Sequence, residues 1–201
     1  MRMQFAFVAC VSVLAASASF AQSTSPSEDT VPLLSLISDI AKRSGKRFVV
    51  DPRAQVDVTL IPRKAEPLSY AELLTVLHVH DLAAVEEGAM VRVIPDANIR
   101  NLAVPLLEDT AERAEADYVT KVIPVRTTPA AMLVPMLRPL MPVQAHLAAS
   151  ICTNDLVIVD TAANVRRIEG IVRSLDDGEE PYTPRECAPR QSTSDESKKP
   201  L

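Results

Sequence analysis

Histidine, the residue type that most often binds metals or transfers protons, occurs three times in this chain, and the spacing of the three residues does not suit a catalytic or metal site. His78 and His80 lie two positions apart at the end of an expected helix, where this spacing turns the two imidazole rings away from each other. The third histidine, His146, is distant in sequence. A zinc site needs three or four converging ligands, so we interpret the histidines as surface or helix-end residues. No metal site and no cofactor are expected.

Motifs for nucleophilic catalysis and phosphate binding are also missing. No serine lies in a Gly-x-Ser-x-Gly turn. The four glycines are too widely spaced for a phosphate-binding loop or for the Gly-x-x-Gly loop of a K-homology domain. Asp51, Asp57 and Asp160 are expected at strand ends and exposed positions, not as an acid–base pair. We therefore expect no catalytic residues and no enzymatic activity.

Composition excludes further classes of function. The net charge is −5 and no basic run is present, which is a poor match for a phosphate backbone, so we do not expect a nucleic-acid partner. Aromatic residues make up 3% of the chain and tryptophan is absent. Valine, isoleucine, leucine and alanine must therefore build the cores, which favours small modules over one large domain.

Residues 1–21 have the pattern of an export signal. Arg2 precedes the apolar stretch 5–16, and small residues before Gln22 place the cleavage between Ala21 and Gln22. The apolar stretch is too short to span a bilayer permanently. We expect the protein to be exported across the inner membrane into the periplasm, with a buried first helix as the alternative.

Cleavage of the predicted signal would remove Cys10 and leave two cysteines, Cys152 and Cys187. Two cysteines in one small domain often pair in an oxidising compartment, so we expect a disulfide that ties the C-terminal tail to the second module. Two separate thiols remain the alternative, because the sequence does not give the distance between the residues.

Hydrophobic periodicity indicates two folded modules, residues 31–96 and 118–177, after a flexible leader at 22–30. The first module is expected to contain a helix from about Pro32 to Gly45, strands at 47–51 and 56–61, a second helix opened by a Ser69–Glu72 capping box, and a hairpin of strands 82–86 and 90–94. Residues 97–117 are expected to form a linker with a short solvated helix at 109–116, and residues 178–201 a disordered tail.

The second module is expected to follow the order strand, helix, strand, strand, helix. The strands are placed at 118–125, 143–149 and 155–160, and Thr128 and Thr161 are expected to cap the helices. In the first of these helices Pro129 is expected at the first position, and Pro135 to cause a kink or an early end. Its expected buried stripe consists of Met132, Leu133, Met136, Leu137 and Leu140. The predicted class is α+β: two small open-sheet domains with helices packed on one face, the second of βαββα, K-homology-like type.

Both modules resemble a known family. Residues 40–53 and the Val-Asp-Val-Thr-Leu strand at 56–60 look like the first periplasmic domain of secretins, and the capped helix and hairpin continue the match. Residues 119–126, 133–140 and 154–169 look like the next secretin N-domain. The resemblance covers about Val31 to Asp176 and implies a stand-alone protein similar to the two N-terminal periplasmic domains of type II secretion secretins, without the pore domain.

Two departures from the family bear on function. The family's first domain begins with an apolar alternating strand, whereas residues 22–30 are polar, so this strand is expected to be weak or missing. That domain is where the inner-membrane partner of secretins docks, and the missing strand puts the direct transfer of this contact in doubt. In addition, nothing after Gly178 resembles a barrel strand.

The resemblance implies a periplasmic protein–protein interaction component of a secretin-type, most plausibly type II, secretion system, which acts in docking or assembly and not as the pore. The expected partners are a secretin or an inner-membrane secretion-system component, with association to the outer membrane only through partners. Self-association through unpaired sheet edges is a further route. The alternative is a signalling or adaptor module like the signalling domain of TonB-dependent receptors.

Candidate contact residues follow from expected exposure, and an ordinary solvated surface is the alternative for each of them. They occupy the outer side of the strand at 56–61 and the polar side of the last helix: Asp57, Thr59, Ile61, Arg166, Arg167 and Arg173.

Overall fold

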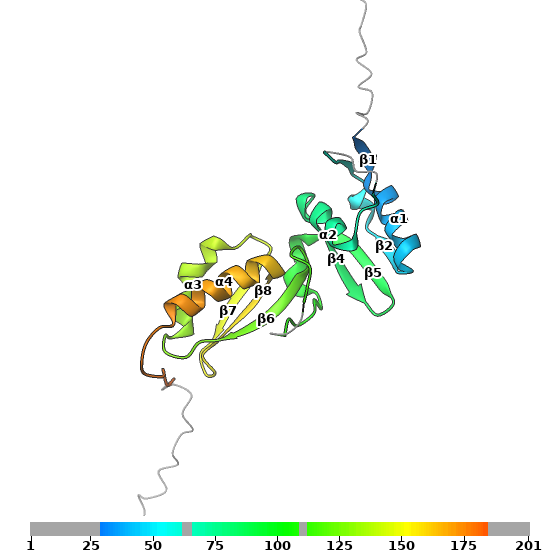
Figure 1. Ribbon diagram of the computed structural model, residues 1–201. Helices are drawn as coiled ribbons and strands as arrows, with labels where there is room; N and C mark the ends of the chain where they lie inside the picture. The colour runs from blue at the N-terminus through cyan, green and yellow to red at the C-terminus, as the bar shows by residue number, and fades with distance from the viewer. Residues whose placement is uncertain (1–28, 62–65, 109–111, 185–201) are drawn as a thin grey trace, which may run out of the picture.

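The computed structural model describes residues 29–61, 66–108 and 112–184 (Figure 1). The predicted signal with its cleavage position at Ala21–Gln22, the leader up to residue 28, and the tail beyond residue 184 with Cys187 lie outside these residues. No helix in the described residues is long and apolar enough to cross a membrane.

The first module contains two small sheets and two helices. Its elements are β1 (Thr30–Pro32), α1 (Leu33–Ser44), β2 (Arg47–Val50), β3 (Asp57–Thr59), α2 (Tyr70–Val79), β4 (Leu82–Glu87) and β5 (Met90–Pro95). Strands β1 and β3 pair antiparallel, and a separate mixed sheet has the order β2-β5-β4. The module is therefore built on two sheets, whereas a single open sheet was expected.

Local sequence signals explain most boundaries of the first module. Gly45 ends α1 with a φ of 69°, which glycine adopts without steric cost. The Ser69–Glu72 capping box opens α2 as predicted. The opening strand that was expected to be weak or missing is present as β1, which begins at the last residue of the predicted leader and continues into the predicted first module. Val31, at the centre of β1, supplies the buried apolar side chain of this strand and is 8% exposed.

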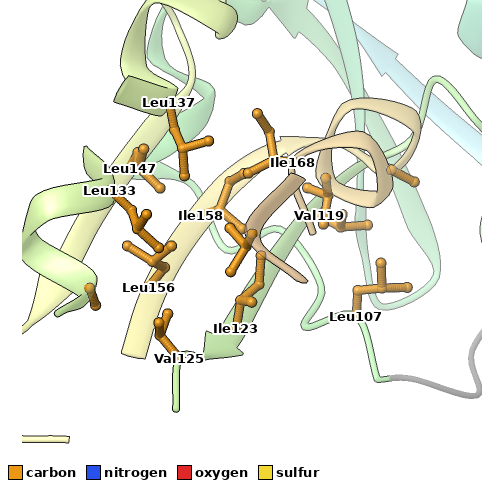
Figure 2. Packing of buried hydrophobic residues seen from close by; sticks show 14 residues of the cluster. Leu107, Val119, Ile123, Val125, Leu133, Leu137, Leu147, Leu156, Ile158 and Ile168 are labelled. Carbon is orange, nitrogen blue, oxygen red and sulfur yellow. The ribbon is translucent and has the colours of Figure 1, made fainter. Parts of the chain in front are cut away.

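The second module has the predicted βαββα order. Its elements are β6 (Tyr118–Pro124), α3 (Ala130–Leu137), β7 (His146–Ser150), β8 (Asp155–Thr161) and α4 (Ala162–Leu175). The strands form one antiparallel sheet in the order β6-β8-β7. Figure 2 shows the core between this sheet and the two helices, where Leu133 and Leu137 of α3 and Ile168 of α4 meet Leu156 and Ile158 of β8.

The start of α3 differs from the prediction. Pro129, not Thr128, is the N-cap residue, and the Thr128 hydroxyl donates to the Leu175 carbonyl at 3.2 Å. The backbone N–H of Ala130 donates to Asn154 Oδ1 at 2.8 Å. The backbone N–H at the buried start of α3 thus finds its hydrogen-bond acceptor in a side chain from the turn before β8. Beyond Pro135 the helix ends early, at Leu137, as expected, and a short 3-10 helix (Arg138–Leu140) follows.

The segment between the modules is packed against both of them. A 3-10 helix (Asp96–Asn101) leads into it from Asp96, the last residue of the first module, and Leu107, 6% exposed, joins the core of the second module. Thr120 donates to the Pro105 carbonyl at 2.8 Å and accepts from the Leu107 N–H at 2.7 Å. The short helix expected at 109–116 is not found in its described part, residues 112–116, where Ala114 and Ala116 pack against the first module instead.

Replacing Asn154 should destabilise the second module strongly. Asn154 is buried with a φ of 59°, accepts from Ala130, and donates to the Val125 and Thr128 carbonyls. Asn154→Ala should lower the free energy of unfolding by about 2–4 kcal/mol, because buried polar groups lose their partners. Asn154→Gly should cost less, since glycine tolerates the positive φ. Denaturant unfolding measures the stability of both variants, and Asn101→Ala, which replaces an exposed asparagine, is the control. If all three variants were equally stable, Asn154 would not have this structural role.

Candidate docking surface

Helix α3 exposes a second row of apolar side chains. Leu133 and Leu137 point into the core, but the other members of the predicted stripe do not. The prediction that Met132, Met136 and Leu140 are buried is wrong: they are 63%, 57% and 43% exposed. Val143, in the loop after the 3-10 helix, is 88% exposed. We call these four residues, Met132, Met136, Leu140 and Val143, the α3 apolar surface.

The spacing of the α3 apolar surface makes it continuous. Residues four apart on a helix are neighbours on one face, so Met132 and Met136 form a row that Leu140 extends. Methionine side chains are flexible and polarisable and recur at protein-binding surfaces. Contiguous exposed apolar groups of this kind mark interaction sites on soluble proteins. The arrangement suits an apolar protein partner and offers no group for catalysis.

Two arginines hold the backbone beneath this surface. Arg167 Nη2, on α4, donates to the Leu140 carbonyl at 2.6 Å, and Arg138 Nη1 donates to the Ala145 carbonyl at 2.9 Å. Both bonds fix the loop that follows α3. Arg167 was expected as a candidate contact residue, and in the structure its side chain binds the backbone beside the α3 apolar surface.

The other two predicted arginines also have partners within the chain. Arg166 donates to the Arg113 carbonyl at 3.1 Å and to Glu115 Oε1 at 3.2 Å, both in the segment between the modules. Arg173 lies 3.5 Å from Glu169 and its side chain is 78% exposed. Arg166 and Arg173 thus each have an acidic partner inside the chain, and the Arg173 side chain is more exposed than that of Arg166, at 78% against 40%.

The predicted contact residues of the first module lie together. Asp57 and Thr59 are exposed on β3, and Ile61, just beyond it, is 80% exposed. Val58 between them is buried, so the predicted alternation is correct. The Thr59 hydroxyl lies 3.3 Å from that of Thr30 across the β1–β3 pair. In the described residues β3 pairs with no strand other than β1, which leaves its outer edge open to a further strand.

The histidines do not form a site. His78 packs edge-on against Tyr118 with ring centroids 5.9 Å apart, and His146 is exposed on β7. Within the described parts of the chain, no group of three or more His, Cys, Asp or Glu side chains is placed to hold a metal ion.

One functional carboxylate was not found from the sequence. Asp176, just past α4, accepts hydrogen bonds from the N–H groups of Arg126, Thr127 and Thr128 at 2.7, 2.7 and 2.9 Å and from the Thr127 hydroxyl at 2.7 Å. Burial opposes its ionisation, but these hydrogen bonds outweigh it and lower the pKa of Asp176 to about 2. The carboxylate therefore fastens the β6–α3 connection to the end of α4, and so fixes where α3 begins.

The comparisons with known proteins agree with this architecture. Residues 29–93 match the family model described as GspD-like, N0 domain. Secretin XcpQ of Pseudomonas aeruginosa is 35% identical over 142 residues, which cover 70% of this chain and 21% of XcpQ. Secretin ExeD of Aeromonas hydrophila is 27% identical over 178 residues, which cover 86% of this chain and 26% of ExeD.

A solved structure gives the same result. The type II secretion system outer membrane complex of Klebsiella pneumoniae, with PulD, PulS and the PulC HR domain, matches with a TM-score of 0.64 and 25% identity. The match covers 76% of this chain and 27% of the compared chain. The two modules therefore have the fold of secretin N-terminal domains.

The chain carries a GspD-like N0 domain and is homologous to the N-terminal region of type II secretins, which confirms the predicted resemblance. It spans about a quarter of the length of the curated relatives it matches. These homologous domains are structural components of secretion systems and not enzymes, in agreement with the prediction for this chain.

The hydrogen bonds of Asp176 should make stability depend on pH. The folded pKa of about 2 lies below the ordinary value of 3.8, so Asp176 contributes stability above pH 4, and this contribution is lost as the pH falls toward 2. Asp176→Ala should cost about 2 kcal/mol at pH 7 by denaturant unfolding, and the difference from wild type should shrink between pH 4 and 2. The exposed neighbour Asp177→Ala is the control, and a pH-independent difference would contradict the assignment.

Proposed function

We propose that this protein is a periplasmic interaction component of a type II secretion system that docks onto secretin-type modules and does not itself form the pore. The observation that carries the proposal is the α3 apolar surface on a module homologous to secretin N-domains. The signal pattern of residues 1–21, together with this homology, supports the proposed export to the periplasm.

The character of the α3 apolar surface supports a protein partner. It joins four exposed apolar side chains above a backbone that Arg138 and Arg167 hold in place, so little ordering of the backbone is needed on binding. Central apolar anchors of this kind carry most of the energy of protein interfaces.

A second contact is proposed for the first module. The Klebsiella pneumoniae structure contains the PulC HR domain together with PulD, which supports an interaction of this chain with a second secretion-system component. The open edge of the β1–β3 pair, with Asp57, Thr59 and Ile61 beside it, is the proposed location. The presence of β1 removes the objection that the family's opening strand is missing.

The signalling alternative is not favoured. It would require the first module alone, whereas the similarity to XcpQ extends over 142 residues and therefore includes more than residues 29–93.

The cysteines are proposed to form a disulfide between Cys152 and Cys187. Cys152 lies in the turn before β8, next to Asn154, whose carbonyl accepts from the Val125 N–H at 3.1 Å. The adjacent Arg126 carbonyl accepts from the Tyr182 N–H at 2.7 Å. Tyr182 is therefore held near the end of the sheet that carries Cys152, and Cys187 follows it by five residues, a stretch of chain that can extend to about 16–18 Å.

Replacing the methionines of the α3 apolar surface should weaken docking. The double variant Met132→Ser/Met136→Ser should bind purified secretin N-domains at least about tenfold more weakly, because it removes two central apolar anchors. Biolayer interferometry with the purified protein, together with cross-linking in periplasm, measures this. The matched control is Val49→Ser/Val79→Ser, which replaces side chains that are 49% and 73% exposed on the first module. Unchanged binding of a folded methionine variant would overturn the proposal.

The disulfide should be detectable directly. Peptide mass spectrometry under non-reducing conditions should recover Cys152 linked to Cys187, and reduction should separate them. Cys152→Ser should lower the free energy of unfolding by about 2–4 kcal/mol, because a closed loop restricts the unfolded chain. Free thiols at both positions, measured by alkylation of protein taken from periplasm, would contradict the pairing.

A further inference from the structure

A buried carboxylate joins the two modules. Asp96 follows β5 and is 4% exposed, and Tyr118, the first residue of β6, is 2% exposed. The Tyr118 hydroxyl donates to Asp96 Oδ2 at 2.7 Å, and Gln144 Nε2 donates to the same oxygen at 2.8 Å. One oxygen of the first module thus accepts from two side chains of the second. A buried polar group needs such partners, and these two donors reach the oxygen only while the modules keep their present orientation.

Apolar packing surrounds this carboxylate. Ala83 and Val85 of β4 lie in one cluster with Ile99 and Val104 of the connecting segment and with Val159 of β8. Their side chains are at most 9% exposed. The face of β4 that points away from the helices of the first module is therefore covered by the connecting segment and by the second sheet. This cluster exists only while the modules keep their present orientation.

The connecting segment makes an independent bridge. The carbonyls of Asp117 and Glu115 accept from the first N–H groups of α4, those of Ala162 and Ala163, at 2.8 and 3.0 Å. On its other side Ala114 packs against the core of the first module. The segment therefore caps a helix of one module while it contacts the core of the other.

We propose that the Asp96–Tyr118–Gln144 junction is a conformational lock that holds the two modules and the connecting segment as one rigid, cooperatively unfolding body. The β1–β3 edge and the α3 apolar surface then keep a fixed relative orientation. Opening the lock would expose the cluster around Val85 and Val159 and let the two modules move independently. The inference does not depend on the identity of any partner.

The lock has a chemical basis in the tyrosine hydroxyl. Burial, together with the neighbouring Asp96 carboxylate, raises the pKa of Tyr118 far above its ordinary value. The hydroxyl therefore keeps its proton and donates to Asp96 at any physiological pH. Tyr118→Phe removes this donor but leaves the ring in the apolar cluster, so it tests the contribution of the hydrogen bond alone.

Two measurements on the purified protein test the lock. Wild type should unfold in a single calorimetric transition, and Tyr118→Phe should lower the midpoint by about 3–8 °C and split the transition in two. Spin labels on exposed helix positions, placed by Ser38→Cys and Ser174→Cys with the native cysteines replaced by serine, should give one narrow distance distribution that Tyr118→Phe broadens. Tyr182→Phe, which removes a partly exposed hydroxyl, is the matched control and should change neither result.

Asp96→Ala provides the second variant, because it removes the acceptor itself. It should broaden the distance distribution at least as much as Tyr118→Phe does. A broad distribution in the wild-type protein, or a distribution that stays narrow in both variants, would overturn the proposal. If either variant fails to fold, the wild-type distribution alone still decides between a rigid and a hinged arrangement.

Discussion

In each module, packing the helices against one small sheet buries only some of the apolar side chains and leaves others on the outer faces. With 3% aromatic residues and no tryptophan, the cores are thin and each helix buries a single row against its sheet. In α3 that row is Leu133 and Leu137, so Met132 and Met136 are left outside. In the first module the far face of β4 would be left bare as well, and the connecting segment and second module cover it.

Because the cores are thin, hydrogen bonds from a few polar side chains are also needed to hold the elements together. Thin layers leave helix starts and loop connections near the core, and their backbone groups need partners there. Asn154 supplies them for the start of α3, and Asp176 supplies them for the connection between β6 and α3. Lys121, 6% exposed on the core side of β6, is tied to Glu169 of α4 at 2.7 Å. These bonds hold α3 in place and hence present its outer row in one arrangement.

A rigid body with an exposed apolar row and an open strand edge suits a role in assembly. Docking surfaces on a jointed chain would be presented in many relative orientations, whereas the junction at Asp96 fixes one. Homology to the N-terminal region of type II secretins gives this geometry its context. The Klebsiella pneumoniae complex shows such domains alongside other secretion-system components.

The sequence by itself determined the order of elements apart from β1 and the helix expected at 109–116. It also determined the βαββα pattern of the second module, the capping box at Ser69, the Thr161 cap and the family resemblance, because these depend on periodicity and on residues close in the chain. The tertiary structure alone decided which of the two rows on α3 is buried, since Met132 and Leu133 are equally apolar and only the position of the sheet separates them. It also decided that the side chain of Asn154, not that of Thr128, accepts from the first N–H of α3, and that Asp96 meets Tyr118 and Gln144. These partners lie 22 to 48 residues apart, beyond the reach of local patterns, and are brought together by packing.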